Sequence, residues 1–418
     1  MKIAVIGAGV VGVATALALA RRGHEPVVFD RRATIGEEAS FGCTGLVTHG
    51  WPWPWPPDGN PMPVWGSRAT PGWLGWTRRP TAGTSDTALA AWVRHARALV
   101  QLGEDLLSPP PTHLATGDAD SEDTPPASSG LLVFWRHADH HDRAMGRLDQ
   151  LADAGLPLEG LDIGTVRSLE PGLDPDTPLA RVLRIGSCFT AVPRQAAMRW
   201  RDEALAAGAR FAMAHEVMGM TPGEQPRLRW RASGSETQHE AAFDAVAVCA
   251  GAASAPLLHA AGWRGRSWLM QGKSVSAPLA DAVFAPRHAV FDADRQTLLV
   301  AQGGRLRVAG AFADARASAP ASPREAYAGL YRAPEDWFPG AARLRGQHQG
   351  TVQHWEALIS RSRDGLPLIG TCDLPGIWVN MDHGAQGWAM APGSARLLVA
   401  LIDGAAAPID AAPFSPGR

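Results

Sequence analysis

Residues Met1–Asp30, MKIAVIGAGVVGVATALALARRGHEPVVFD, constrain the fold more than any other part of the chain. Lys2–Ile6 is an apolar run typical of a buried strand, and the glycine-rich turn Gly7–Gly12 follows it directly. A helical pattern covers Val10–Arg22, and Pro26–Phe29 predicts a second strand that ends at an acid. Strand, glycine turn, helix, strand and acid in this order are the fingerprint of a dinucleotide-binding fold.

Each part of the fingerprint has a physical task. Gly7 allows the tight turn, Gly9 removes a side chain that would block the pyrophosphate, and Gly12 lets helix and strand pack closely. The N-terminus of the helix presents N–H groups and a partial positive charge to the phosphates. Asp30 can accept hydrogen bonds from ribose hydroxyls, and it lies near the usual spacing of about 20 residues. The sequence therefore predicts that the chain binds a dinucleotide.

Length, charge and cysteine content narrow the classes of protein to which the chain can belong. A length of 418 residues predicts two or three domains, and a formal net charge of −2 argues against a nucleic-acid partner. The four cysteines are scattered without the spacing of a metal or redox motif, which favours reduced thiols. The sequence around His137 and His141 resembles a metal site, but we interpret it as a polar helix end and predict no metal.

No targeting or membrane signal stands out. The N-terminus lacks a charged region and a cleavage site, and the apolar stretches fall short of the roughly 20 residues that span a bilayer. We expect a cytoplasmic protein, or one that is peripheral on the inner face of a membrane.

The rest of the chain alternates between predicted helices and strands. Residues 51–80 are rich in Trp and Pro, so we expect an extended arm, a wall of the substrate site, or a contact to a membrane or redox partner. Ser108–Ser129 is expected to be a mobile surface insertion. Helices are predicted over 87–107, 137–151, 192–208 and 392–403, and strands over 130–135, 210–213, 242–250, 267–277, 297–311 and 377–381.

Short motifs occur in a fixed order over nearly the whole chain. They are Gly7–Gly12, Glu38–Phe41 with Gly45, Leu169–Pro171, Val248–Gly251, Ser254–Leu258, Gly272 and Ser274 with Pro278, Arg305–Gly310, Asp364–Gly365 with Pro367 and Ile369–Gly370, Asp382–Gly384, Gly387–Trp388 and Gly393–Ser394. In this order they resemble the FAD-dependent amine and amino-acid oxidoreductases of the D-amino-acid oxidase superfamily, and within it the bacterial D-amino-acid dehydrogenases.

The resemblance implies an α/β fold with two domains. A Rossmann-like FAD-binding domain with a mainly parallel sheet would comprise residues 1–85, 165–265 and 350–418. An inserted substrate domain on an antiparallel sheet would comprise 86–164 and 266–349. The flavin ring would lie between the two domains, and the turn at 383–388 would place its N–H groups at the pyrimidine edge of the flavin.

The resemblance also implies a set of cofactor contacts. Asp30 with its two following arginines would hold the ribose and phosphate side, and Val217 would meet the adenine. The full expected set is Ile6, Gly7, Gly9, Val10, Val11, Gly12, Asp30, Arg31, Arg32, Ser40, Thr44, Gly45, Leu46, Val217, Ala250, Gly251, Gly384, Ala385, Gln386, Gly387 and Trp388.

The substrate side departs from the family pattern. Relatives carry an arginine that grips the substrate carboxylate, but alignment on Trp355 places Ile359 at that position. Arg361 is expected to replace it, with Arg363 as the alternative, because alternate residues of a strand share a face. The lysine that dehydrogenases carry is shifted to Lys273, and His49 is a candidate proton acceptor. The candidate catalytic residues are therefore His49, Lys273 and Arg361.

The expected activity is FAD-dependent oxidation of the C–N bond of an amino acid. Hydride would pass to the flavin, the imine would hydrolyse to a keto acid and ammonia, and electrons would pass to a quinone or another acceptor of the respiratory chain. Three alternatives remain open: an oxygen-using oxidase of the glycine or sarcosine type, a flavoprotein that has lost amine chemistry, and a protein that binds NAD alone.

Overall fold

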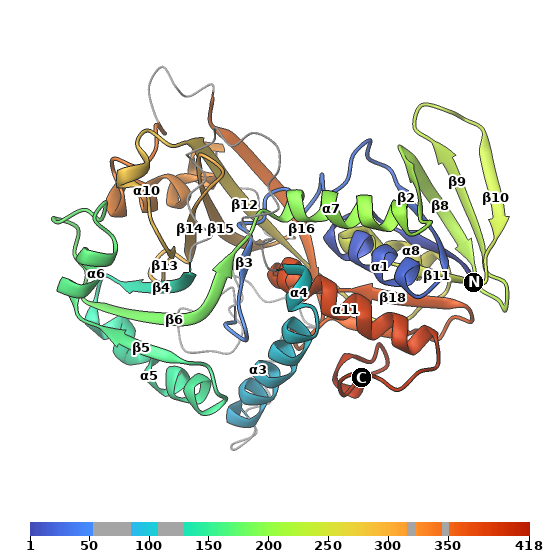
Figure 1. Cartoon of the computed structure of the whole chain (residues 1–418), viewed down its shortest axis with the longest axis horizontal. Helices are drawn as coiled ribbons and strands as arrows, with labels where there is room; N and C mark the ends of the chain where they lie inside the picture. Colours follow the sequence, from blue (N-terminus) through green and yellow to red (C-terminus); the bar gives the residue numbers. More distant parts are fainter. Residues whose placement is uncertain (53–84, 108–128, 316–322, 345–350) are drawn as a thin grey trace.

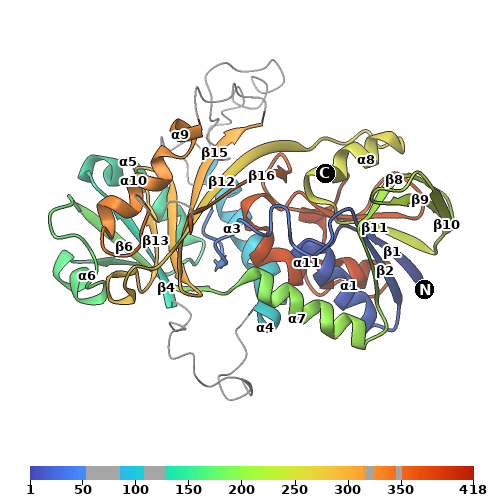
Figure 2. The same ribbon diagram turned by 90° about the horizontal axis from the view of Figure 1, so that it is seen from above.

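The structure is a computed structural model that describes residues 1–52, 85–107, 129–315, 323–344 and 351–418. Nearly all of the Trp- and Pro-rich segment at 51–80, and the insertion at 108–128, lie outside the described residues. Two large sheets lie in opposite halves of the molecule, as Figure 1 and Figure 2 show. In the described part of the chain, no helix combines the length and the apolar character that a membrane crossing needs.

The first large sheet carries the fingerprint. Its strand order is β17-β18-β11-β1-β2-β7, and every neighbouring pair is parallel except the edge pair of β17 and β18. The strands are β1 (Lys2–Ile6), β2 (Glu25–Asp30), β7 (Arg210–Met213), β11 (Ala245–Val248), β17 (Leu368–Thr371) and β18 (Ile377–Met381). The central strands are continuous apolar runs because layers cover both of their faces.

Helices cover one face of this sheet and a small sheet lies on the other side. Helices α1 (Val10–Arg21), α7 (Pro193–Ala206) and α11 (Gly387–Ile402) pack side by side in one apolar core, which also receives Leu99 of α3 (Ser85–Leu102). Strands β8 (His215–Thr221), β9 (Arg227–Ala232) and β10 (Gln238–Ala242) form the small antiparallel sheet. Its Leu228 packs with Val246, Val248 and helix α8 (Ser254–Ala260).

The second large sheet has nine strands. Its order is β16-β12-β15-β14-β13-β4-β6-β3, with β5 beside β6, and only the pair of β13 and β4 is parallel. The strands are β3 (Leu46–Val47), β4 (Ser129–Trp135), β5 (Leu158–Leu161), β6 (Arg181–Thr190), β12 (Trp268–Pro278), β13 (Ala289–Asp292), β14 (Thr297–Gln302), β15 (Arg305–Asp314) and β16 (Gln353–Arg361).

Both faces of the nine-stranded sheet are covered, as strand alternation requires. Leu132 and Phe134 of β4 point to a core that contains Trp337 of α10 (Ala328–Trp337). Leu131 and Val133 point to the opposite core, which contains residues of α5 (Ala138–Asp153). The other α-helices within the described residues are α4 (Glu104–Leu107), α6 (Ile163–Leu169) and α9 (Pro323–Ala326).

Sheet membership does not follow the expected domain segments throughout. Strands β3, β6 and β16 belong to the nine-stranded sheet, although they fall in the segments expected to build the FAD-binding domain. Helix α3 packs against α11 on the side of the fingerprint sheet, although its residues were expected in the substrate domain. The chain therefore crosses between the two sheets more often than its sequence indicates.

Candidate functional site

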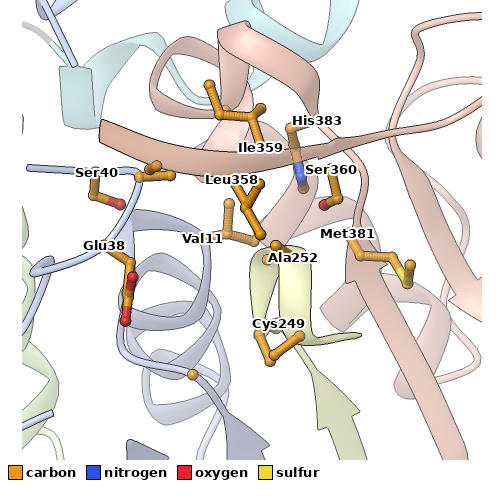
Figure 3. Close-up of a pocket in the computed structure, with 18 of the residues that line it drawn as sticks. Val11, Glu38, Ser40, Cys249, Ala252, Leu358, Ile359, Ser360, Met381 and His383 are labelled. Atoms are coloured by element: carbon orange, nitrogen blue, oxygen red, sulfur yellow. The ribbon is translucent and has the colours of Figure 1, made fainter. Parts of the chain in front are cut away.

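A cavity of about 800 Å³ lies between the two large sheets. It runs from the glycine turn after β1, past the start of β8 and the short helix η2 (Gly251–Ala253), to the turn after β18. Strands β12 and β16 of the nine-stranded sheet form the opposite wall. Figure 3 shows this arrangement, with β16 crossing above α1 and η2.

The glycine turn fits closely against its neighbours. Gly7 has φ +105°, and a Cβ there would lie 2.6 Å from the carbonyl oxygen of Cys249. A Cβ on Gly12 would lie 1.8 Å from the carbonyl oxygen of Gly7, so helix α1 and strand β1 meet at their backbones. Helix α1 begins without a side-chain cap from Gly9 and without an acid in its first turn. Its N-terminal partial charge is therefore not neutralised by an acid of its own first turn.

Asp30 holds the turn in place through its carboxylate. Oδ2 accepts a hydrogen bond from the N–H of Ala8 at 2.6 Å, and Oδ1 accepts one from the N–H of Arg32 at 2.7 Å. Burial raises the pKa of this carboxyl, while the two N–H groups act in the opposite direction. The carboxylate lines the cavity beside Arg31, so it can also accept a hydrogen bond from a bound molecule.

The loop that contains Ser40 closes the cavity beside the helix. Ser40 Oγ accepts a hydrogen bond from the N–H of Val10 at 3.1 Å. Arg307 of β15 donates to the carbonyl oxygens of Phe41 at 2.7 Å and Cys43 at 2.8 Å. A residue of the nine-stranded sheet therefore fixes a loop that covers the glycine turn.

The turn after β18 brings polar groups to the cavity from the far end of the chain. His383 is buried, its Nε2 lies 3.0 Å from Ser394 Oγ, and burial lowers its pKa to about 3. The ring is therefore neutral at physiological pH. Helix α11 begins directly after the short helix η5 (Gly384–Gln386), so the start of α11 lies at the cavity.

Strands β12 and β16 contribute a polar cluster that consists of Gln271, Lys273 and Glu356. Lys273 is only 6% exposed, and its Nζ lies 2.9 Å from Gln271 Oε1 and 3.5 Å from Glu356 Oε2. Gln271 Nε2 donates to Glu356 Oε1 at 2.5 Å. Lys273 and Glu356 are directly opposite in the antiparallel pairing, so their side chains share one face of the sheet. This buried ammonium group is held by its neighbours and faces the cavity.

An apolar surface adjoins this cluster. Leu358 and Ile359 both line the cavity, and Figure 3 shows their side chains extending from opposite sides of β16. Ile359 packs so closely against Gly272 that a Cβ there would lie 2.9 Å from Ile359 Cδ1. The position expected to carry the carboxylate-binding arginine is thus part of a close apolar contact.

Most of the expected cofactor residues line the cavity, and five do not. Gly12 packs against Gly7, Gly45 against Ala191, and Leu46 begins β3. Arg32 Nε donates to Glu38 Oε1 at 2.7 Å, and Gln386 Nε2 donates to the carbonyl oxygen of Trp51 at 2.7 Å. Those that line it are Ile6, Gly7, Gly9, Val10, Val11, Asp30, Arg31, Ser40, Thr44, Val217, Ala250, Gly251, Gly384, Ala385, Gly387 and Trp388.

Only one of the three candidate catalytic residues, Lys273, lines the cavity. The structure does not bring His49 there: its Nδ1 donates to the carbonyl oxygen of Ser187 at 2.8 Å, and its Nε2 lies 3.3 Å from Glu104 Oε1. Arg361 is also outside the lining: it is the last residue of β16, and its backbone forms a bridge with His383. Arg363 follows the end of β16 and is likewise absent from the lining.

The sequence did not indicate several of the residues that line the cavity. Glu356 can be identified as a site residue only from the strand register, which places it opposite Lys273. Asp382 and His383 stand in a motif that carried the resemblance, yet the motif did not indicate that both side chains are buried at the cavity. Phe312 and Ser360 carry no signal in the sequence, because strand residues of this kind are common in any sheet.

Comparison with known proteins agrees with this geometry. The family described as FAD dependent oxidoreductase matches residues 2–401. The chain is similar to the D-amino acid dehydrogenase of Cereibacter sphaeroides, at 31% identity over 455 residues, which cover 100% of this chain and 97% of that protein. It is also similar to the D-amino acid dehydrogenase of Rhizobium johnstonii, at 28% identity over 98% of each chain.

Solved structures show the same architecture. Glycine oxidase from Geobacillus kaustophilus aligns with a TM-score of 0.72 at 20% identity, over 100% of this chain and 99% of that chain. L-proline dehydrogenase from P. horikoshii aligns with a TM-score of 0.71 at 17% identity, over 100% of this chain and 97% of that chain. These likenesses confirm the expected fold class of a Rossmann-like domain combined with a second sheet domain.

Proposed function

The chain belongs to the FAD dependent oxidoreductase family, and from its cavity we propose that it oxidises the C–N bond of an amino acid. Bound FAD would accept a hydride from the carbon beside the amine. The substrate would leave as an imine, to which water adds while ammonia departs, so that a keto acid remains. The similarity to proteins named D-amino acid dehydrogenase supports an amino acid as the substrate.

The residues present fit FAD. The cavity falls within the range of about 300–1,000 Å³ for cofactor sites, and it begins at the N-terminus of α1, whose first turn carries no acid. At that end Gly7, Gly9 and Asp30 would hold the pyrophosphate and ribose, with Val217 beside the adenine. At the other end the N–H groups at the start of α11 would stabilise negative charge on the flavin ring.

One observation carries the substrate assignment, and it is the buried ammonium group of Lys273. An ammonium group has three donors, of which Gln271 and Glu356 engage two, so one remains for a substrate carboxylate. Arg31 also lines the cavity, but it is paired with Glu38 at 2.9 Å on the side of the glycine turn. Lys273 would therefore replace the arginine that is missing at Ile359.

The apolar lining would complete the site. Leu358, Phe312 and Trp355 line the cavity on the side of the nine-stranded sheet. They would exclude water from the reacting carbon and strengthen the interaction between Lys273 and a carboxylate, because charges attract more strongly in a medium of low dielectric constant. This surface favours a substrate with an apolar side chain.

The test uses the two lysines of the chain, Lys2 and Lys273. Purified holoprotein is mixed anaerobically with a panel of D-amino acids and N-alkyl glycines, and the flavin absorbance is followed. Lys273→Met should raise KM by roughly 10- to 100-fold, because a charge-assisted hydrogen bond is lost. Lys273→Arg should retain part of the affinity, and Lys2→Met should behave as the parent. If no compound of the panel bleaches the flavin of the parent, the proposed function is wrong.

We further propose that electrons leave to a quinone or another carrier of the respiratory chain, from a cytoplasmic or peripheral membrane location. The name dehydrogenase of the similar proteins supports this acceptor over oxygen. Reoxidation is measured with a water-soluble quinone and with air. Release of one peroxide per substrate in air, at a rate that matches turnover with the quinone, would instead favour the oxidase alternative.

A further inference from the structure

Asp382 occupies an unusual backbone conformation at the end of β18. Its φ is +62°, which places it among only four non-glycine residues with positive φ in the described part of the chain. A side chain in this region strains the backbone, and such strain is kept where the surrounding structure or the function requires it. The side chain is 1% exposed and lines the cavity.

The carboxylate of Asp382 is only partly satisfied. Ser267 Oγ donates to Oδ1 at 2.8 Å, and the Ser360 hydroxyl lies near the carboxyl group. Oδ2 is buried, and it has no hydrogen-bond partner among the residues that the structure describes. Buried carboxylate oxygens are nearly always paired, because their removal from water is costly. An oxygen of this kind in a cavity wall indicates a donor on the molecule that the cavity binds.

Nearby charged groups do not supply that donor. His383 follows in the chain, but its buried ring is neutral and its Nε2 is directed to Ser394. Arg418 acts on the carboxyl by charge alone, and its guanidinium is hydrogen-bonded to Asp364. Ser267 and Ser360 contribute hydroxyls only, and no ion pair joins Asp382 to any residue in the described ranges.

We propose that Asp382 Oδ2 is a binding site for an N–H donor of the molecule in the cavity. Two sources share this chemistry, the ring N–H of the flavin and the amine of the substrate. The first source follows from the family of the chain, whereas the second rests on the proposed function. In either case Asp382 is a binding residue that is absent from the expected site residues.

Two substitutions of Asp382 distinguish the effect of its carboxylate from the effect of its strained backbone. Asp382→Gly removes the acceptor and relieves the positive φ, so the variant should fold at least as well as the parent. Asp382→Asn keeps an oxygen acceptor and tolerates the left-handed conformation, but it removes the charge. Asp373→Asn is the matched control, because Asp373 is exposed and lies between β17 and β18 outside the cavity lining.

Binding is measured in two arms. In the first, apoprotein is titrated with FAD and the quenching of flavin fluorescence is followed. In the second, holoprotein is titrated with 2-aminobenzoate and with benzoate, two carboxylates that differ only in the amine, and the shift of the flavin spectrum is followed. Asp382→Gly should weaken one of these interactions at least tenfold, and Asp382→Asn should weaken it less.

The pattern of losses identifies the donor. A tenfold weaker Kd for FAD, with the ratio of the two benzoates unchanged, assigns the donor to the flavin. A tenfold loss for 2-aminobenzoate, with benzoate and FAD unaffected, assigns it to the substrate amine. If Asp382→Gly binds FAD and both ligands as tightly as the control, the inference is overturned. The FAD titration does not depend on substrate oxidation. Weaker FAD binding by Asp382→Gly would therefore support the inference even if no amino acid reduces the flavin, and failure of this inference can be told apart from failure of the proposed function.

Discussion

The indole nitrogen of Trp388 donates a hydrogen bond to the carbonyl oxygen of Gly45 at 3.0 Å, and both groups are buried. The bond joins the first turn of α11 to the loop that precedes β3, across 343 positions of the sequence. The Trp388 ring also stacks on Trp200 of α7, with ring centroids 5.4 Å apart. These contacts set the separation of two walls of the cavity.

Replacing Trp388 with Phe should therefore weaken both the fold and the binding of FAD. Phe keeps the ring packing but removes one of the two hydrogen bonds that the Gly45 carbonyl oxygen accepts, the other coming from the N–H of Ala191 at 3.0 Å. The loss of that bond should lower the free energy of unfolding by about 0.5–1.5 kcal/mol. Urea unfolding and the Kd for FAD are the measurements. Trp263 is the control, because its ring is buried against His259 but its indole nitrogen donates no hydrogen bond within the described residues. Equal losses for Trp388→Phe and Trp263→Phe would contradict this prediction.

A methyl group at Gly12 should abolish FAD binding. The Cβ would lie 1.8 Å from the Gly7 carbonyl oxygen, so helix α1 must move away from the turn. Gly12→Ala is expected to lower the free energy of unfolding by about 1–3 kcal/mol or more, as overpacking does. Gly146 of α5 has no atom near its hypothetical Cβ, so Gly146→Ala should stabilise the protein by roughly 0.5–1 kcal/mol. Retention of normal flavin content by purified Gly12→Ala would show that the turn tolerates this side chain.

Arg307→Met should release the loop that contains Ser40. The guanidinium is buried and donates to two backbone carbonyls of that loop, and burial lowers its pKa. Its loss should weaken FAD binding at least tenfold. Arg305 of the same strand donates to Ser276 and Thr351 instead, so Arg305→Met should reduce stability without this effect on the cofactor. Similar Kd values for FAD in the two variants would mean that the tether does not position the loop.

Buried His383 should make the fold sensitive to acid. Its pKa is lowered to about 3 in the folded protein, whereas an unfolded histidine titrates near 6.5. The unfolded state therefore binds the proton more readily, and stability is lost as pH falls from about 6.5 toward 3. At pH 5 this amounts to about 2 kcal/mol. The measurement is urea unfolding of the parent and of His383→Gln at pH 7.5 and pH 5.0. The difference between their free energies of unfolding should change by that amount between the two pH values. A difference that stays constant would contradict the prediction.

Asp382 should have the opposite dependence in the apoprotein. Burial raises its pKa to about 6, although the Ser267 and Ser360 hydroxyls oppose this effect. The folded state then holds the proton more tightly, so stability is lost as pH rises from about 4 to 6 and stays lost above that range. Asp382→Asn should be more stable than the parent by about 3 kcal/mol at pH 8, and the gain should vanish near pH 4. Thermal unfolding of both apoproteins at the two pH values provides the comparison.

Local sequence signals located many elements correctly and misjudged others for identifiable reasons. Strands Lys2–Ile6 and Ile377–Met381 begin and end as expected, because their largely apolar runs form buried strands of the fingerprint sheet. The edge strand Arg210–Met213 also has the expected bounds, although none of its residues is fully buried. The last long helix was expected to begin at Pro392 but begins at Gly387, since the structure accommodates this proline inside the helix. Residues 297–311 were expected to form one strand, but Gly303 and Gly304 adopt positive φ and divide it into β14 and β15.

The sequence by itself determined what kind of molecule the chain binds. The fingerprint is local: its glycines, helix start and acid lie within 30 consecutive residues, so their spacing alone predicts their arrangement. The tertiary structure decided which side chains meet that molecule. It placed Lys273 opposite Glu356, turned Arg361 and Ile359 away from Leu358, and packed His49 against Ser187. These outcomes depend on strand register and on contacts between distant segments, and a shift of one residue in a strand would reverse every one of its side chains.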